Sequence, residues 1–481
     1  MRFVWISAGV YALAACSGAT GGETSTSSSG STSSGAAGSS SSTSSSSASS
    51  SSSGSITSHV RWGEDLYAHF AEALGGSGED HGIALTVGRA YQVYVAGTFS
   101  DTMTLDGITL QATRPHDIFL AAFRSDGQLL WLKQPFRGSV ELSARSLRPI
   151  FSDDGVAVAG TFSGTLDLEG TELVSVGQRD IFVTHFSDAG TMSFARRIGG
   201  AGDDVARTFT HDGILAGSFT GEMDVATGVI TSVGQRDAFV LRIDEQGLIQ
   251  SPQGFGGPGD DEALEATTIS TGELLIAGSF QDTLTVDGHT LTSEGGTDIF
   301  LVLQTGGGSR SWAVRVGGVG EDVPLQLALP IEGNRMALLM EGTHDLAPGG
   351  AAAGQHILTF DDTGALTWAL QPPAPVSVIG VTLILRVLML GSFDAPFTYG
   401  QTTLTPVGGT DVHILSTDYN GEPGTARSVG GPGDESATSL SITGLGVVYF
   451  TGSLEDTVSV PEGRGAASNG GPDALIVRIR E

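Results

Sequence analysis

The residues with the clearest capacity for chemistry are carboxylates that follow a glycine turn, as in the sequence GGPGDD at residues 256–261. The pattern G-G-x-G-x-D binds Ca²⁺ in β-roll proteins when it recurs every nine residues, because successive turns then place their oxygens around one ion. Related segments begin at Gly75, Gly199, Gly317 and Gly430, so neighbouring copies are about 60 residues apart or more. This spacing excludes a calcium roll. Two alternatives remain: structural turns, or carboxylates that the fold gathers from distant repeats.

The elements that position these turns belong to a repeat with three landmarks, each present seven times. One is an apolar strand that ends in A-G-[TS]-F or a variant, as in VAGTF at 95–99. Another is D-x-F followed by apolar residues, as in DIFLAAF at 117–123. The third is a strand, aromatic at its start in several units, that leads into the glycine turn, as in FARRIGGAGDD from Phe194. The period is about 59 residues, which is typical of a repeat architecture.

Each repeat contains four short apolar runs, here called A to D in chain order. In the first full unit they are IALTV at 83–87, QVYVAGTF at 92–99, DIFLAAF at 117–123 and LLWLK at 129–133. Four short strands in each of seven units predict an all-β fold, a seven-bladed β-propeller of four-stranded blades. The first unit begins at strand D (65–74) and the last ends at strand C (473–479), so we expect the N-terminal strand to complete the last blade and close the ring.

These landmarks resemble the bacterial SBBP-type β-propeller repeat over residues 65–481. The resemblance implies the same fold. It implies little about activity, because motifs of this kind encode turns and core positions.

In such a blade the D–A and B–C connections share one face, so the acidic pairs of the glycine turns should meet there. We expect an acidic ring that binds Ca²⁺ or a cationic partner, since hard cations prefer clustered carboxylates. The alternative is that glycine permits the turn and the carboxylate caps its amides. The ring residues are Glu79, Asp80, Asp203, Asp204, Asp260, Asp261, Glu321, Asp322, Asp434 and Glu435.

Two units depart from this pattern. The second has FRGSVELSA and the sixth has PAPVSVIG where the acidic turn belongs, and we interpret both as drift rather than as a partner-specific surface. The apolar segment 376–390 contains Arg386, and it is predicted to form two core strands rather than a membrane span.

The amino terminus predicts export and lipidation. Residues 1–15 have the short positive and apolar regions of a signal peptide. They end in Leu-Ala-Ala before Cys16, the only cysteine, and this resembles the lipobox of bacterial lipoproteins. The resemblance implies that Cys16 is lipidated and that the protein is sorted to the outer membrane or cell surface. Residues 16–57, rich in Ser, should form a disordered tether, and the propeller should occupy 58–481.

Charge and motifs limit the function. The net charge of −30 disfavours binding to nucleic acids. The chain has no H-E-x-x-H, G-x-S-x-G or P-loop motif, so we expect no enzyme and no required cofactor, with Ca²⁺ as the candidate ion. The prediction is a monomeric, membrane-anchored binding or scaffold module whose loop-rich face contacts a protein or glycan. The alternatives are a propeller hydrolase acting on extracellular polysaccharide and a purely structural surface protein.

Overall fold

A computed structural model describes residues 70–480, apart from 144, 151, 153, 270–271, 306–310, 330–334, 346–352, 383–384, 419, 444–445 and 461–462. The signal peptide, Cys16 and the Ser-rich tether lie outside the described residues. So do the first residues of the predicted propeller, 58–69.

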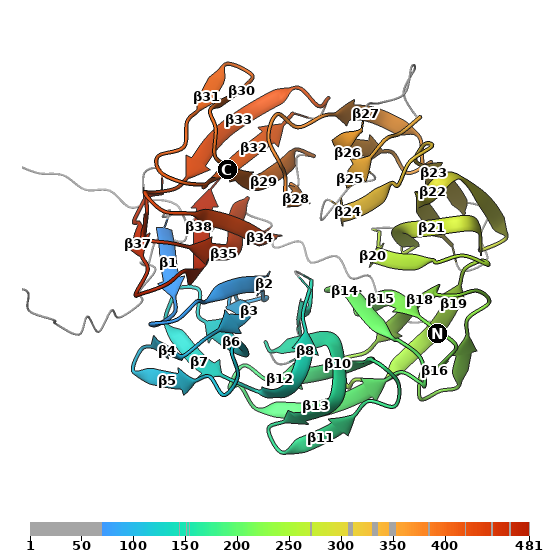
Figure 1. The fold of residues 1–481 in the computed structure, drawn as a ribbon, viewed down its shortest axis with the longest axis horizontal. Helices are drawn as coiled ribbons and strands as arrows, with labels where there is room; N and C mark the ends of the chain where they lie inside the picture. Colours follow the sequence, from blue (N-terminus) through green and yellow to red (C-terminus); the bar gives the residue numbers. More distant parts are fainter. Residues whose placement is uncertain are drawn as a thin grey trace, which may run out of the picture. The chain divides into compact units, whose positions relative to one another are not determined.

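The described chain forms seven antiparallel sheets arranged around a central axis, which confirms the predicted seven-bladed β-propeller (Figure 1). Blades 1 to 7 are numbered here from the sheet that contains residues 81–133. Strands A, nearest the axis, are β2 (His81–Val87), β8 (Phe136–Glu141) with β9 (Leu147–Pro149), β14 (Val205–Phe209), β20 (Glu262–Thr268), β24 (Val323–Ala328), β28 (Val378–Val381) and β34 (Glu435–Ile442).

The other three positions of each blade follow in the same order. Strands B are β3 (Val93–Phe99), β10 (Val156–Leu168), β15 (Ile214–Phe219), β21 (Leu274–Val286), β25 (Met336–Gly342), β29 (Val387–Phe393) and β35 (Val447–Leu454). Strands C are β6 (Asp117–Phe123), β12 (Asp180–Phe186), β18 (Asp237–Ile243), β22 (His289–Gln304), β26 (Gly354–Phe360), β32 (Asp411–Thr417) and β38 (Asp473–Arg480). Strands D are β7 (Leu129–Lys133), β13 (Met192–Ile198), β19 (Ile249–Phe255), β23 (Trp312–Val316), β27 (Leu366–Leu370), β33 (Pro423–Val429) and β1 (Phe70–Leu74).

Strands B and C are largely apolar where they pair with each other, because both faces of a blade pack there against neighbouring blades. All seven residues of β6 and of β12 are buried, whereas β13 and β33 are buried only at their last residue. The interior is therefore a series of clusters between adjacent blades. One example joins Phe119 of blade 1 to Tyr449 and Ile476 of blade 7.

The N-terminal strand completes the last blade, as predicted. β1 pairs antiparallel with β38 in the register Phe70↔Arg478 to Leu74↔Ala474. Two segments at opposite ends of the sequence thus lie side by side and close the ring. β1 thus covers the edge of β38 that the last blade would otherwise leave unpaired.

The connection between strands B and C forms an outer hairpin in most blades. Separate hairpins are β4 (Thr102–Leu105) with β5 (Ile108–Gln111), β16 (Glu222–Asp224) with β17 (Val229–Thr231), β30 (Phe397–Tyr399) with β31 (Thr402–Leu404), and β36 (Thr457–Val458) with β37 (Ala466–Ala467). In blade 2 the end of β10 pairs with β11 (Thr171–Val174), and in blade 4 β21 continues to pair with β22.

The two degenerate units differ in structure. In blade 2 the inner strand is interrupted: β8 and β9 both pair with β10, and the described residues Leu142, Ser143, Arg145 and Ser146 lie outside both strands. In blade 6, β28 and β29 are buried core strands, which confirms the prediction for the apolar segment 376–390.

Candidate functional site

The second carboxylate of each glycine turn is buried and caps that turn. Each accepts a hydrogen bond from the backbone N–H of the glycine four residues earlier. We call these five residues the capping carboxylates. With their glycine partners and N···O distances they are Asp80 (Gly76, 2.8 Å), Asp204 (Gly200, 2.7 Å), Asp261 (Gly257, 2.6 Å), Asp322 (Gly318, 2.7 Å) and Glu435 (Gly431, 3.0 Å).

A second set of buried carboxylates faces the first, and sequence reasoning assigned it no role. These strand-C aspartates begin strand C in five blades and lie within the longer β22 in blade 4, and each accepts a hydrogen bond from the backbone N–H of the residue four positions earlier. They are Asp117, Asp180, Asp237, Asp298, Asp411 and Asp473. The D-x-F landmark marked their positions. The signal that could have shown their role is an aspartate at the start of an otherwise apolar strand.

The two sets meet at the joints between blades, on either side of the first glycine of the turn. At the joint between blades 3 and 4, a Cβ on Gly256 would lie 2.8 Å from Asp237 Oδ1 and 2.8 Å from Asp261 Oδ2. Such distances are too short for a real Cβ, so glycine is required there. The carboxylates of Asp237 and Asp261 are therefore close neighbours, because an oxygen of each lies 2.8 Å from the same point.

The first carboxylate of each glycine turn lies nearer the surface. Asp203 forms a bidentate ion pair with Arg179, at 2.7 Å from both Nε and Nη2. The Thr297 backbone N–H donates to Glu321 at 3.1 Å, and the Thr410 N–H donates to Asp434 at 2.7 Å. These partners belong to B–C connections, so the D–A turns and the B–C connections share one face.

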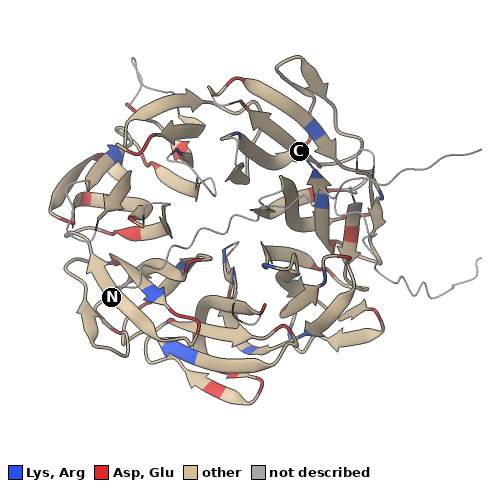
Figure 2. Cartoon of the chain, turned by 180° about the vertical axis from the view of Figure 1, so that it is seen from behind, with Lys and Arg blue, Asp and Glu red and all other residues tan. Residues whose placement is uncertain are grey.

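The ten predicted residues thus form pairs at five blade joints. In each pair one carboxylate is buried and the other is nearer the surface. Asp260 and Glu79 occupy the outer position at their joints, as Asp203 does at its own. Figure 2 shows Asp and Glu distributed around the ring rather than collected on one blade. The proposed binding of a cation by the ten residues stays a prediction.

Burial is the main cause of raised pKa values among these carboxylates. It raises the pKa of Asp80 to about 6, of Asp204, Asp261 and Asp473 to about 7, and of Glu435 to about 8. For all five, a neighbouring carboxylate adds to the effect. Protonation of such groups stabilises the folded chain, and this contribution is lost as the pH rises from the unfolded value near 4 through about 7 to 8.

The joints differ in whether a positively charged side chain neutralises the buried carboxylates. Arg197 Nη1 lies 2.5 Å from Asp180 at the joint between blades 2 and 3, and Arg315 Nη1 lies 2.8 Å from Asp298 between blades 4 and 5. Within the described residues, no lysine or arginine forms an ion pair with either carboxylate at three other joints. These three bare joints lie between blades 3 and 4, 6 and 7, and 7 and 1.

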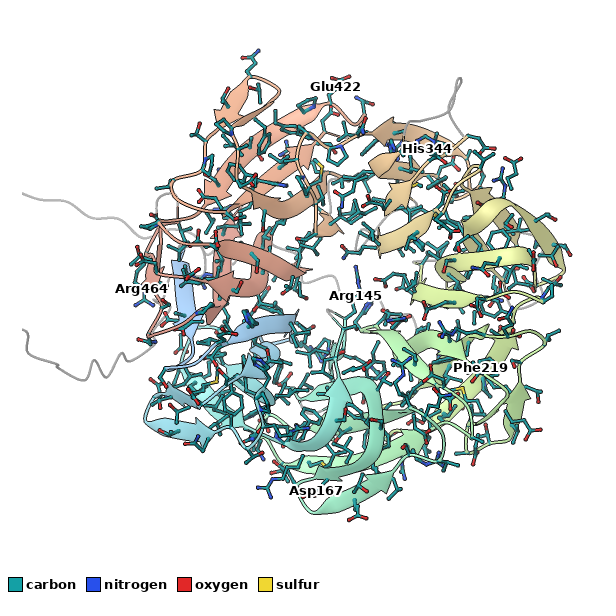
Figure 3. All side chains as sticks on the ribbon, in the orientation of Figure 1. Arg145, Asp167, Phe219, His344, Glu422 and Arg464 are labelled. Carbon is teal, nitrogen blue, oxygen red and sulfur yellow. The ribbon has the colours of Figure 1, made fainter. Side chains whose placement is uncertain are left out.

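The central channel contains a second group of polar residues that sequence reasoning missed. Arg145 lies on the loop that interrupts the inner strand of blade 2 and points toward the centre of the ring (Figure 3). Its Nε lies 2.5 Å from Glu265 of blade 4, and its Nη2 donates to the Leu327 carbonyl of blade 5 at 3.0 Å. Thr208 of blade 3 donates to the same glutamate at 3.1 Å. The degenerate second unit therefore links four blades, which no local pattern indicated.

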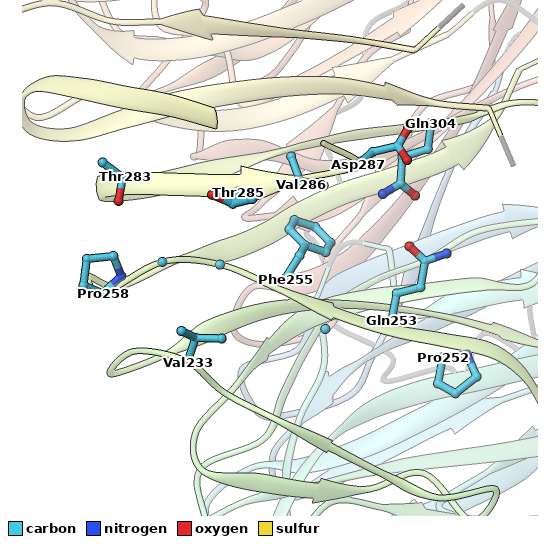
Figure 4. Close-up of a pocket in the computed structure, with 13 residues that line it drawn as sticks. Val233, Pro252, Gln253, Phe255, Pro258, Thr283, Thr285, Val286, Asp287 and Gln304 are labelled. Atoms are coloured by element: carbon cyan, nitrogen blue, oxygen red, sulfur yellow. The ribbon is translucent and has the colours of Figure 1, made fainter. Parts of the chain in front are cut away.

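A groove of about 750 Å³ lies at the rim between blades 3 and 4. The glycine turn Gly256–Pro258 and β19 form one wall, and residues 283–287 of blade 4 form the other (Figure 4). Gln253, Gln304 and Asp287 lie near one end of the groove, and Val233 and Pro258 lie near the other. Among the described residues that line this groove, Asp287 is the one with a charged side chain.

Strand D of blade 3 lacks an aromatic contact that strands D of other blades make with the next blade. Trp131 of blade 1 packs against Gly190 of blade 2, and its indole N–H donates to the Asp188 carbonyl at 2.9 Å. Trp312 makes the same kind of contact from blade 4 to blade 5. In β19, the residue at this register position is Gln250, opposite Arg242. Blade 3 therefore lacks this ring, as does blade 6, whose strand D (Pro423–Val429) contains no aromatic residue.

Among the described residues, no group of three or more His, Cys, Asp or Glu side chains is arranged to hold a metal ion. The described part of the chain also contains no helix with the length and hydrophobicity needed to span a bilayer.

No protein-family model matches the chain, and comparison with curated proteins yields no match. Solved structures with a similar fold include the WD40 domain of Neurospora crassa Pan2, with 10% identity and a TM-score of 0.41 over 86% of this chain and 96% of that one. A quinohemoprotein alcohol dehydrogenase from Pseudomonas putida HK5 matches with 9% identity and a TM-score of 0.38 over 86% and 76%. A puromycin hydrolase matches with 12% identity and a TM-score of 0.35 over 80% and 58%.

Proposed function

We propose that this chain is a non-enzymatic binding module, held at a bacterial outer membrane or cell surface through lipid on Cys16. The groove between blades 3 and 4 is the observation that carries this proposal, since ligand sites are concave and combine apolar walls with a few polar groups. Its volume of about 750 Å³ lies within the range of such sites.

The lining favours an uncharged, hydroxyl-rich ligand. Gln253 and Gln304 each offer an amide that both donates and accepts hydrogen bonds, and Thr283 and Thr285 add hydroxyls. Asp287 contributes a single carboxylate, and the chain carries a net charge of −30, which repels acidic polymers. We therefore propose a neutral polysaccharide segment as the ligand.

A glycan array with the purified protein tests this function. We expect retention of neutral glycans, with at least a tenfold weaker affinity for the double variant Gln253→Ala, Gln304→Ala, because each removes a pair of hydrogen-bonding groups. Val233→Trp should also block binding, since Val233 is 80% exposed at the mouth of the groove. The matched control is Gln250→Ala, which lies on the same strand but does not line the groove.

Four outcomes would contradict the proposal. Cleavage of a retained glycan, seen as new reducing ends, would favour a hydrolase. Retention that both groove variants leave unchanged would place binding elsewhere. Capture of a protein in a pull-down, with no glycan bound, would favour a protein partner, and no ligand in either assay would favour a purely structural role.

A further inference from the structure

The seven blade joints form a natural series in which the number of buried carboxylates varies. The joint between blades 1 and 2 lacks the capping carboxylate, and its single strand-C aspartate, Asp117, is bound by Arg114 Nε at 2.8 Å and Gln134 Nε2 at 2.6 Å. The joint between blades 5 and 6 has neither carboxylate. There Gln355 donates to the Val376 carbonyl and accepts from its N–H.

Six of the seven joints contain a buried carboxylate, and three of these six have an arginine: the joint with the lone carboxylate and two of the joints with a pair. The joint without a carboxylate has a neutral glutamine instead. Each of the three bare joints has two buried carboxylates that form no ion pair with a lysine or arginine of the described residues. Two buried charges of one sign are expensive unless something neutralises them.

The joint between blades 6 and 7 shows most clearly that its two buried carboxylates lack a neutralising group. Asp411 Oδ2 accepts from the Val407 N–H, and Glu435 Oε2 accepts from the Gly431 N–H. The second oxygen of each, Asp411 Oδ1 and Glu435 Oε1, is buried and has no hydrogen-bond partner. Both side chains are at most 1% exposed. Buried polar atoms are rarely left unpaired, and a missing ion is one explanation.

The other two bare joints repeat this arrangement. Asp261 Oδ1, between blades 3 and 4, and Asp473 Oδ1, between blades 7 and 1, are buried and accept no hydrogen bond of good geometry, although the Gln281 backbone N–H lies close enough to lower the pKa of Asp261. Asp237 and Asp80 complete the two pairs. Each of the three bare joints therefore has two buried carboxylates and at least one unpaired oxygen. Asp204 Oδ1 and Asp298 Oδ1, at the two joints with an arginine, are also unpaired, so the absence of the arginine is what distinguishes the bare joints.

We propose that each of the three bare joints binds a hard divalent cation, Ca²⁺ in the first instance, between its capping carboxylate and its strand-C aspartate. Ca²⁺ accepts oxygen ligands at about 2.3–2.6 Å, so one ion can contact two carboxylates that lie a few ångströms apart. Backbone carbonyls and water complete its coordination. With two carboxylates per site the affinity is weak, with a Kd of about 10⁻⁴–10⁻³ M, as in extracellular calcium modules.

The binding of a proton is the competing explanation. A proton on Glu435 would also neutralise part of the charge that it shares with Asp411, Asp434 and Asp456. Asp261 is surrounded by Asp237 and Asp260, and Asp80 by Asp101, Asp473 and His116. The proton and the cation compete for the same oxygens, so the two explanations predict opposite behaviour at high pH.

The experiment measures thermal unfolding and Ca²⁺ binding by calorimetry on the full chain in nonionic detergent at pH 8, where the carboxylates tend to ionise. We expect Ca²⁺ at about 5 mM to raise Tm by several degrees relative to EDTA at equal ionic strength, because it binds the folded chain preferentially. Calorimetry should detect about three ions per chain. The proposal would be overturned if calorimetry detected no heat of binding and Ca²⁺ did not shift Tm. It would also be overturned if Tm fell as the pH rose and did not respond to Ca²⁺.

Two sets of variants assign the sites. The triple variant Asp80→Asn, Asp261→Asn, Glu435→Gln keeps an oxygen for the glycine N–H but removes one charge from each bare joint. We expect it to lose most of the Ca²⁺ response and, in EDTA at pH 8, to be at least as stable as the unsubstituted chain. The matched control is Asp204→Asn, Asp322→Asn, at the two joints that carry an arginine. A Ca²⁺ response that is lost equally in both sets, or retained in both, would contradict the assignment.

Discussion

At the scale of single residues, the capping carboxylates serve the turn in every joint that has one. Each accepts a hydrogen bond from a glycine N–H, which is the structural role that the sequence left open beside cation binding. The two roles are compatible, because a carboxylate has two oxygens and the cap uses one. At the joint between blades 6 and 7 the other oxygen is the unpaired one.

Arg145 carries the first residue-scale prediction. Arg145→Met leaves Glu265 buried without its counter-charge, so we expect the free energy of unfolding to fall by about 1–3 kcal/mol at pH 8. Burial raises the pKa of Glu265 to about 7, although Arg145 lowers it, so the loss should shrink at pH 5, where the glutamate is protonated. Urea unfolding at both pH values measures this difference.

The double variant Arg145→Met, Glu265→Gln is the control for that prediction. It removes the uncompensated charge and should recover most of the lost stability at pH 8. An equal loss at both pH values would show that Arg145 contributes through packing rather than through charge.

At the scale of strands, the aromatic residue of strand D packs against the next blade. Trp131 is 7% exposed, lies against Gly190 and donates a hydrogen bond to the next blade. The contact explains why an aromatic residue opens several copies of the landmark that leads to the glycine turn.

Trp131→Ala tests this contact. We expect a loss of about 3–5 kcal/mol in the free energy of unfolding, since a large buried ring is replaced by a cavity and a hydrogen bond is lost. The control is Leu130→Ala on the same strand, which is 38% exposed and should change stability by about 0.5 kcal/mol or less. Similar losses for the two variants would contradict the role assigned to the tryptophan.

At the scale of the whole molecule, closure of the ring depends on one five-residue strand. β1 pairs with β38 and buries Ala71 and Leu74 between blades. Without it, β38 becomes an exposed edge of apolar residues, which is a surface that pairs with other chains.

Deletion of residues 65–74 tests closure. We expect the truncated chain to associate into oligomers or aggregates in size-exclusion chromatography and to unfold at a Tm lower by several degrees. Addition of the peptide 65–74 should restore the monomer, because strand pairing does not require a covalent link. A stable monomer without β1 would show that closure contributes little.

Much of the fold was predictable because the repeat is a local pattern. The strand landmarks, the seven units and the closing strand follow from residues near one another in the chain, since alternating apolar strands and glycine turns form in the same way in each copy. The capping carboxylates were visible for the same reason. From the sequence alone, the second unit was interpreted as a repeat that had drifted. No residue near Arg145 in the sequence indicates which distant residues its side chain contacts.

The sequence by itself determined the architecture, the number of blades and the face on which the acidic turns lie. Only the tertiary structure decided which carboxylates meet, which joints lack a cation, where Arg145 binds and where a groove remains. These features join residues that are far apart in the chain, such as Asp80 with Asp473 and Arg145 with Leu327. Burial then sets their chemistry, because the cost of an uncompensated charge depends on the atoms that surround it rather than on its neighbours in sequence.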